Sequence, residues 1–137
     1  YFNYVNNLKV IIVDRDPRDL FLSNELYWKG AAFICDTKDI YKYINWYKTM
    51  RQHRKYEIQG NEILNIKFED LIFNYEKSLN QLNEFLNLKA SNHKNKSKYF
   101  DPKVSSINLK IWEKTNKDNY QKELKMIEKE LGEYCYD

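Results

Sequence analysis

An arginine and a serine near the start of the chain have the types and the spacing that suit phosphate binding. Arg15 lies just after the apolar run at residues 10–13, and Ser23 lies two turns into the helix expected after Pro17. Arginine offers a planar fork of N–H donors that matches a phosphate group, and a serine hydroxyl adds one neutral donor. Because ligands of open α/β sheets bind at the carboxyl ends of the strands, we expect both side chains to contact one phosphate.

The elements around these two residues follow from local chemistry. Residues 10–13 are β-branched and apolar, which is typical of a strand buried on both faces of a parallel sheet. Asp16 is placed to cap the following helix, and Pro17 suits the first helical position, where its missing N–H leaves no donor unpaired. Asp19 falls in the first turn, near the positive end of the helix dipole. The pattern predicts a strand, a capped turn and a helix.

Helices and strands alternate along the rest of the chain. Thr37 is placed to cap a helix that ends near Tyr56, before a turn at Gly60 and Asn61. Residues 62–68 alternate and then run apolar, which predicts a second buried strand parallel to the first. The apolar stripe of the helix after Thr37 consists of Ile40, Tyr43, Ile44, Tyr47 and Met50.

Two further helices are expected in the second half of the chain. One covers residues 75–88, and after a polar, lysine-rich loop at 92–98 the last one begins near Asp118, where Gln121 completes a capping-box pattern. The expected apolar positions are Leu79, Leu82, Phe85 and Leu86 in the first and Tyr120, Leu124, Ile127 and Leu131 in the last. The fold class predicted is α/β, with part of a doubly wound parallel sheet.

Three motifs, taken in order, resemble those of a known family. The run RDPRDLFLS from Arg15 to Ser23 resembles the 3′-phosphate-binding segment of sulfotransferases that use 3′-phosphoadenosine 5′-phosphosulfate (PAPS). The run IKFEDL at residues 66–71 and the helix after it are similar to a strand end and helix of that family. Residues 99–112, YFDPKVSSINLKIW, are similar to the late loop of its bacterial members. Each motif alone is weak evidence, but the ordered set spans most of the chain.

The resemblance implies a P-loop-kinase-like sulfotransferase architecture. It also implies transfer of a sulfuryl group from PAPS, as co-substrate and with no metal, to a hydroxyl or amine of a carbohydrate-like acceptor. In that family the loop that cradles the 5′-phosphosulfate and the general base lie upstream of the segment that opens this chain. The glycines, Gly30, Gly60 and Gly132, form no such loop. Residues 1–137 are therefore expected to be the C-terminal part of one sulfotransferase domain, inactive alone, with its catalytic residues unassigned.

The late segment adds residues to the expected nucleotide site. In the family a basic, hydroxyl-bearing loop closes over the nucleotide, and the matching donors here are Lys98, Lys103, Ser105, Ser106 and Asn108. A solvated linker before Trp112 explains the same residues equally well. We interpret Trp112 itself as a packing anchor rather than a platform for base stacking.

Other polar residues have simpler explanations beside the functional ones. Arg15 alone could be a surface ion-pair partner of a neighbouring aspartate, but the matched Ser23 favours ligand binding. Glu69 and Asp70 could act as a general acid and base, yet their place at a strand end favours helix caps or ion-pair partners. Three basic residues at a helix end could reach the acceptor or the cofactor, but a position facing water is the favoured interpretation: Arg51, His53 and Arg54. His93 is expected to be an exposed loop residue.

Composition limits the class of protein. With 137 residues, 42% hydrophobic content and 12 tyrosines, the chain is long enough for one core rich in Tyr and Phe. Its net charge of +3 comes from scattered lysines, which permits an anionic nucleotide and an acidic glycan but indicates no nucleic-acid partner. No run reaches the roughly 18 apolar residues of a membrane span, and Cys35 and Cys135 lack metal or redox spacing. These features predict a reduced, cytoplasmic compartment.

Two other functional classes stay open at this level. A nucleotide or sugar kinase would use a related sheet, and an upstream Gly-x-x-x-x-Gly-Lys-Ser/Thr loop would identify it. A non-catalytic interaction module would instead bind a partner, or a second copy as a homo-oligomer, through an uncovered sheet edge.

Overall fold

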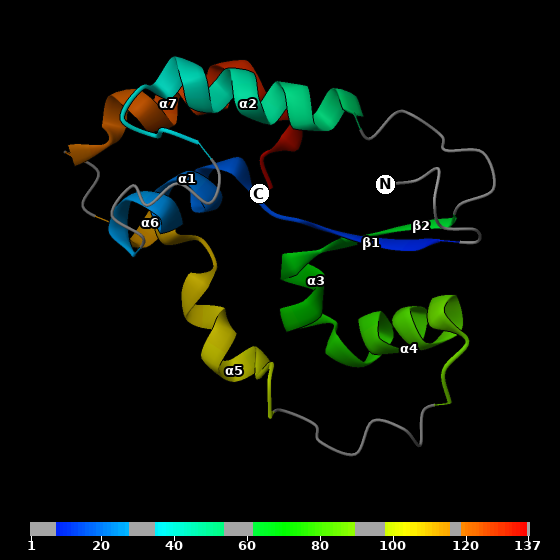
Figure 1. Cartoon of the computed structure of the whole chain (residues 1–137). Helices are drawn as coiled ribbons and strands as arrows, with labels where there is room; N and C mark the ends of the chain where they lie inside the picture. Colours follow the sequence, from blue (N-terminus) through cyan, green and yellow to red (C-terminus); the bar gives the residue numbers. More distant parts are fainter. Residues whose placement is uncertain (1–7, 28–34, 54–61, 90–97, 116–118, 137) are drawn as a thin grey trace. The chain divides into compact units, whose positions relative to one another are not determined.

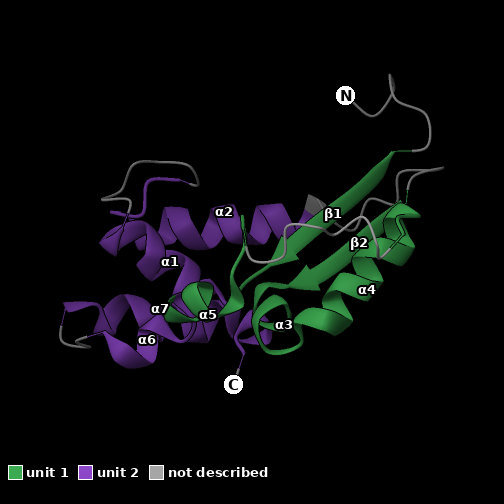
Figure 2. Cartoon of the chain, turned by 90° about the horizontal axis from the view of Figure 1, so that it is seen from below, with its two compact units in different colours: residues 1–15, 57–107 green, residues 16–56, 108–137 purple. Residues whose placement is uncertain are grey.

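A computed structural model of the chain describes residues 8–27, 35–53, 62–89, 98–115 and 119–136. Its elements, in chain order in Figure 1, are β1 (Lys9–Asp14), α1 (Pro17–Leu26), α2 (Ile40–His53), β2 (Glu62–Lys67), α3 (Phe68–Phe73), α4 (Tyr75–Leu86), α5 (Pro102–Ser105), η3 (Ser106–Asn108), α6 (Ile111–Lys114), α7 (Gln121–Leu131) and η5 (Gly132–Tyr134). The chain divides into two compact units, coloured in Figure 2: residues 1–15 and 57–107 form unit 1, and residues 16–56 and 108–137 form unit 2.

Unit 1 contains a parallel two-stranded sheet. β1 pairs with β2 from Lys9 opposite Glu62 to Asp14 opposite Lys67, so the two strands end at the same edge. The predicted parallel pairing is confirmed, and Figure 1 shows the two arrows side by side. β2 ends one residue before the predicted end because Phe68 already begins α3.

The prediction that the first strand is buried on both faces is wrong for the described part of the chain. Ile11 and Val13 are 38% and 51% exposed, whereas Val10 and Ile12 are half-buried. Successive side chains of a strand point to opposite faces, and β1 has one partner strand, β2, among the described residues. The wider doubly wound sheet therefore stays a prediction.

A lysine joins the start of the sheet to the end of α4 within unit 1. The Lys9 ammonium lies 3.0 Å from the Glu62 carboxylate and 5.2 Å from the centre of the Phe85 ring, and it also bonds to the Phe85 carbonyl. A cation is favourable at this end of a helix, where carbonyl groups lack intrahelical partners. α4 stops at Leu86, before the predicted end at 88, because Asn87 adopts a left-handed backbone with φ 55°.

Apolar burial on α4 is only partial. Leu79, Leu82 and Phe85 are half-buried, and Leu86, which was predicted to share their face, is 36% exposed. The buried hydroxyl of Ser78 donates to the backbone carbonyl of Asp70 at 3.1 Å. This bond ties α4 to α3 by polar contact where apolar packing is thin.

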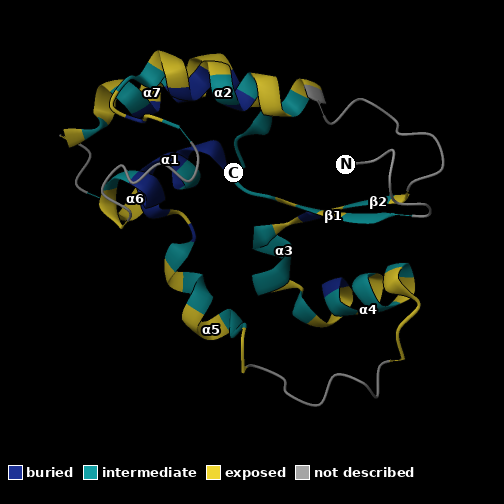
Figure 3. Ribbon diagram, in the orientation of Figure 1, coloured by how far each residue is buried: buried dark blue, intermediate teal, exposed yellow. Residues whose placement is uncertain are grey.

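Unit 2 holds the hydrophobic core. Dark blue, buried segments appear on α1, α2 and α7 in Figure 3, and the core cluster consists of Phe21, Leu22, Tyr43, Ile44, Tyr47, Ile111, Leu124, Ile127 and Leu131. Tyr43 packs edge-on against Phe21 with ring centres 5.4 Å apart, and its hydroxyl donates to the Pro17 carbonyl at 2.7 Å. The predicted tyrosine- and phenylalanine-rich core is confirmed here, with the phenolic oxygen satisfied as a buried tyrosine requires.

Three details of the predicted helices are corrected in unit 2. Met50 is 46% exposed rather than buried, and Tyr120 is only half-buried. Arg51, predicted to face water, is half-buried with its guanidinium 4.9 Å from the Tyr47 ring and 4.6 Å from the Tyr134 ring. Cation–π attraction to the two aromatic rings therefore holds the guanidinium against the protein, although it lies near the end of the helix.

The caps of two helices also differ from prediction. Asp39, not Thr37, caps α2, because its carboxylate accepts the backbone N–H of Tyr41 at 3.0 Å. Thr37 is buried instead, and its hydroxyl accepts from the Asn24 amide at 2.6 Å and donates to Glu25. α7 begins after Tyr120 without a side-chain cap. Residues Arg54, Tyr56, Gly60, Asn61, His93, Asp118 and the loop at 92–97 lie outside the described residues, as does the side chain of His53.

Candidate functional site

Arg15 occupies the predicted position at the carboxyl end of the parallel strands. It follows β1 directly, and its guanidinium carbon lies 5.1 Å from the centre of the Phe68 ring, at the residue where β2 gives way to α3. Stacking on an aromatic face fixes the plane of a guanidinium and favours its positive charge. The strand-end geometry that phosphate binding requires is therefore present in unit 1.

The start of the late segment meets the same phenylalanine in unit 1. The ring of Phe100 packs edge-on against Phe68, with centres 6.4 Å apart, and stacks on Tyr75 at 6.2 Å. α5 follows at once, capped by Asp101, whose carboxylate accepts the Lys103 N–H at 2.9 Å, and it packs against α3. Phe68 thus brings the late segment and Arg15 to one edge of the sheet.

The predicted late residues differ in exposure. Lys98 and Lys103 are exposed, with the Lys98 ammonium 4.9 Å from the Tyr99 ring, and Ser105 is half-buried on α5. Ser106 is occupied locally, because its hydroxyl donates to the Lys103 carbonyl at 2.7 Å. Asn108 is half-buried and belongs to unit 2.

Asp16 caps α1 in unit 2, as predicted, but its carboxylate has further partners. It accepts the backbone N–H of Arg18 at 2.8 Å and that of Tyr136 at 2.8 Å. The Arg18 guanidinium also contacts it at 2.7 Å, and both side chains are almost completely buried. The end of the chain is thereby fastened to the start of α1.

Arg18 is a buried cation that sequence reasoning did not single out. Its guanidinium donates to the Tyr136 carbonyl at 2.6 Å, lies 3.3 Å from the Glu128 carboxylate and sits 3.8 Å from the centre of the Trp112 ring. Burial alone would lower the pKa of Arg18, but the hydrogen bond and charge of Asp16 outweigh it and raise that pKa further. Trp112 therefore serves as the predicted packing anchor, with Arg18 against its ring.

Ser23 lies on α1 within the same unit and is 7% exposed. Its hydroxyl oxygen is buried and has no hydrogen-bond partner among the described residues. A buried hydroxyl left unpaired costs about 1–3 kcal/mol, so such an atom in a native structure calls for an explanation such as a ligand or water. Arg15 and Ser23 belong to different units, and their sharing of one phosphate stays a prediction.

Asp19 has a role that its place in the first helical turn did not indicate. Its carboxylate, 1% exposed, accepts the backbone N–H groups of Lys110 at 2.7 Å and Ile111 at 2.6 Å, with Trp112 at 3.4 Å. These partners begin α6, which has no cap from its own preceding residue. These partners lie about 90 residues further along the chain. No local sequence pattern could have predicted that Asp19 would cap α6.

Glu69 and Asp70 lie inside the first turn of α3, not at the end of the preceding strand. Lys67 occupies the cap position and makes no side-chain cap bond, so neither carboxylate caps this helix. The Asp70 carboxylate accepts from the Asn74 amide at 3.1 Å, one turn further on. This position favours a structural role through the helix dipole, and the cap prediction is wrong.

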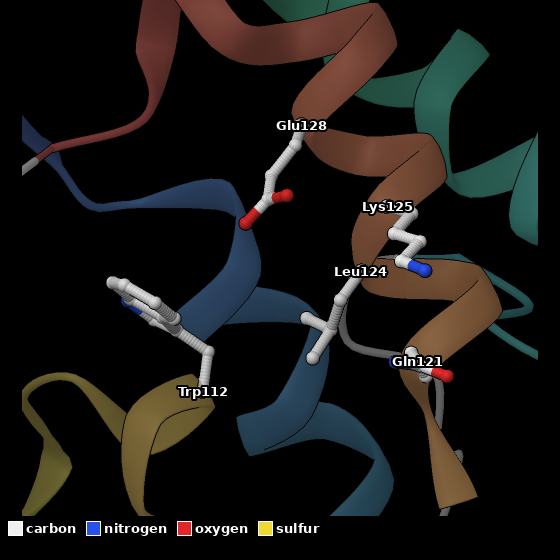
Figure 4. Close-up of a pocket in the computed structure, with 5 residues that line it drawn as sticks. All are labelled: Trp112, Gln121, Leu124, Lys125 and Glu128. Carbon is white, nitrogen blue, oxygen red and sulfur yellow. The ribbon is translucent and has the colours of Figure 1, made fainter. Parts of the chain in front are cut away.

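A pocket of about 180 Å³ lies between α6 and α7 in unit 2. In Figure 4 Trp112 lies opposite the side chains of α7 that face it, and the lining residues are Trp112, Gln121, Leu124, Lys125 and Glu128. None of the predicted site residues lines this pocket. Two of the lining groups, the Glu128 carboxylate and the Trp112 ring, contact Arg18.

A parallel strand pair with intervening helices defines an α/β protein. Arg15, at the end of β1, and the buried Ser23, on α1, are candidate anion-binding residues of their separate units. The model of the sulfotransferase domain family matches residues 4–134. The chain belongs to this family. No curated protein and no solved structure matches the chain significantly.

No described helix has the length and apolarity needed to cross a membrane. Within the same residues, no group of three or more His, Cys, Asp or Glu side chains is arranged to hold a metal ion.

Proposed function

We propose that this chain supplies the 3′-phosphate-binding part of a sulfotransferase that uses PAPS. The observation that carries the proposal is the buried hydroxyl of Ser23, which lacks a hydrogen-bond partner among the described residues. A phosphate oxygen would accept its proton and remove the cost of the unpaired group. Arg15, held on Phe68 at the end of β1, would supply the charged donors. Family membership favours sulfuryl transfer over the kinase alternative.

The late segment would complete the nucleotide site. Lys98, Lys103, Ser105 and Asn108 carry the ammonium, hydroxyl and amide groups that suit a polyanionic nucleotide. Exposure of the two lysines leaves their charges available to a ligand. The contacts of Phe100 with Phe68 hold the beginning of this segment beside the residue that also contacts Arg15.

The reaction would be an in-line displacement at sulfur. An acceptor hydroxyl or amine forms a new bond to the sulfur atom, the bond from sulfur to the phosphate oxygen breaks, and adenosine 3′,5′-bisphosphate leaves. The acceptor proton passes to a general base that we do not assign. Arg15 and Ser23 would anchor the nucleotide through its 3′-phosphate, so that their contribution is to orient the reacting atoms. We propose a carbohydrate-like acceptor, a cytoplasmic protein and the doubly wound, P-loop-like architecture on the resemblance alone.

Calorimetric titration of the intact protein tests the 3′-phosphate assignment. Adenosine 3′,5′-bisphosphate should bind more tightly than adenosine 5′-monophosphate, which offers no 3′-phosphate. Arg15→Ala and Ser23→Ala should each lower the affinity for the bisphosphate by roughly 10- to 100-fold, which corresponds to the loss of a hydrogen bond to a charged group. The affinity for the monophosphate should not change. Equal affinities for the two nucleotides would refute the proposal.

Ser78→Ala provides the matched control for Ser23→Ala. Both hydroxyls are buried on helices, but that of Ser78 already donates to the Asp70 carbonyl. Ser78→Ala should therefore lower the free energy of unfolding by about 1 kcal/mol without weakening the binding of the nucleotide. Ser23→Ala should show the opposite pattern, with unfolding unchanged or slightly more costly, because an unpaired buried hydroxyl is removed.

A further inference from the structure

The carboxylate of Asp19 organises the backbone from which α6 begins. Its two oxygens accept hydrogen bonds from the backbone N–H groups of Lys110 at 2.7 Å and Ile111 at 2.6 Å, and a longer one from that of Trp112 at 3.4 Å. With 1% exposure, the carboxylate is shielded from water. Charge-assisted bonds of this kind are roughly twice as strong as neutral ones, so the carboxylate is a strong polar tie between α1 and this segment.

The segment needs such a tie because its backbone is unfavourable on its own. The backbone of Lys110 adopts a left-handed conformation with φ 49°. Residues other than glycine, asparagine and aspartate rarely adopt this conformation. A strained residue of this kind persists only where the surroundings enforce it. The three aligned N–H groups would also repel one another without an anion between them. The position of residues just before Lys110 therefore depends on Asp19.

Asp19 also lies on the face of α1 that carries Ser23. The two residues are four positions apart in a helix, so their side chains lie one above the other. Both are buried, and the Ser23 hydroxyl is the one without a described partner. Asn108 precedes Lys110 by two residues. Even in an extended chain its backbone lies at most about 7 Å from that of Lys110, which Asp19 binds. All four residues belong to unit 2.

We infer that Asp19 is a positioning residue of the nucleotide site, which holds Asn108 on the side of α1 from which Ser23 binds the 3′-phosphate. The inference rests on the proposed function. Asp19 does not contact the nucleotide itself, because its oxygens are occupied by backbone donors. In this inference its effect on binding passes through Asn108.

A double-mutant cycle on the intact protein tests this dependence, with adenosine 3′,5′-bisphosphate as the titrant. Asp19→Asn keeps the shape of the side chain but places an amide N–H group against the backbone donors. It should lower the affinity for the nucleotide about tenfold or more. Asn108→Ala should weaken it by a similar factor, as a hydrogen bond to a charged phosphate predicts. In the Asn108→Ala background, Asp19→Asn should cost less than about twofold further, because the two residues act as one unit.

A purely structural Asp19 would give a different result. Its replacement would lower stability in both backgrounds and weaken the nucleotide equally in both, and additive losses would overturn the inference. Asp39→Asn is the matched control, since Asp39 caps α2 in the same unit with its carboxylate exposed to water; it should leave affinity unchanged. If Asp19→Asn does not fold, the cycle is measured with Lys110→Gly added throughout, since glycine adopts φ 49° without strain.

Nucleotide binding by the wild-type protein tests the proposed function separately from the role of Asp19. Failure of the wild type to prefer the 3′,5′-bisphosphate over the 5′-monophosphate refutes the proposed function, and the inference falls with it. Preference by the wild type with an additive cycle refutes the role of Asp19 alone.

Discussion

The guanidinium of Arg18 lies 3.8 Å from the centre of the Trp112 ring, although the two residues come from opposite ends of the chain. The same guanidinium contacts the buried Asp16 carboxylate at 2.7 Å. One cation thus joins the cap of α1 to the aromatic anchor of α6. One face of Trp112 is therefore packed against Arg18 as part of the fold.

Replacing Arg18 by Met should strongly destabilise the protein. Removal of one partner of a buried ion pair leaves the other charge uncompensated and typically costs about 3–5 kcal/mol. Chemical denaturation followed by circular dichroism would measure the loss. Lys48→Met is the control, because the Lys48–Glu130 pair at 2.7 Å is solvent-exposed and should contribute far less. Similar losses for the two variants would contradict the central role of Arg18.

Replacing Lys110 by Gly should raise stability. Glycine takes the left-handed backbone at φ 49° without the steric cost that a lysine incurs, and the gain should be about 1 kcal/mol. Asn87→Gly offers a matched comparison, since Asn87 has φ 55° at the end of α4. Asparagine tolerates this conformation better than lysine does, so its replacement should gain less. Thermal unfolding would rank the two, and a loss of stability in Lys110→Gly would show that the Lys110 side chain contributes more than its strain costs.

Cys35 should react slowly with iodoacetamide near neutral pH. Burial, and then the charge of Asp36, raise the pKa of this thiol, and the thiolate is the reactive form. Its rate of alkylation should therefore keep increasing at pH values where an ordinary cysteine has levelled off. Asp36→Asn removes the second cause and should accelerate the reaction by about twofold or more. Mass spectrometry of the labelled peptide gives the rate, with Asp39→Asn as the neutral control.

Asp70→Asn should reduce stability slightly and leave turnover of the folded enzyme within about tenfold. Its carboxylate accepts from the Asn74 amide on the same side of α3, an exposed contact that is worth about 1 kcal/mol or less. Thermal unfolding and initial-rate kinetics on the intact protein would check both parts. A general base replaced by its amide would instead keep its stability and lose roughly 100-fold or more in turnover. That second pattern, in either Asp70→Asn or Glu69→Gln, would assign the residue to catalysis.

Local chemistry determined much of the framework of this protein. The Asp16 cap and the helix from Pro17 follow from bonds that span only two to four residues, so their signature lies in adjacent positions. The buried stripe of Tyr43, Ile44 and Tyr47 likewise follows from the period of the helix. The parallel pairing of β1 with β2 was also predictable, from two apolar runs separated by helical sequence.

Tertiary structure alone decided how the buried polar groups are satisfied. Thr37 was expected to cap a helix, but its hydroxyl pairs with Asn24 and Glu25 once α1 lies nearby. Asp19 is expected from the sequence to lie near its own helix dipole or beside Arg15. Burial instead obliges its charge to find donors, which come from the start of α6. A buried charge must be paired, but the sequence carries no information on which distant donor reaches it, because that depends on how the elements pack.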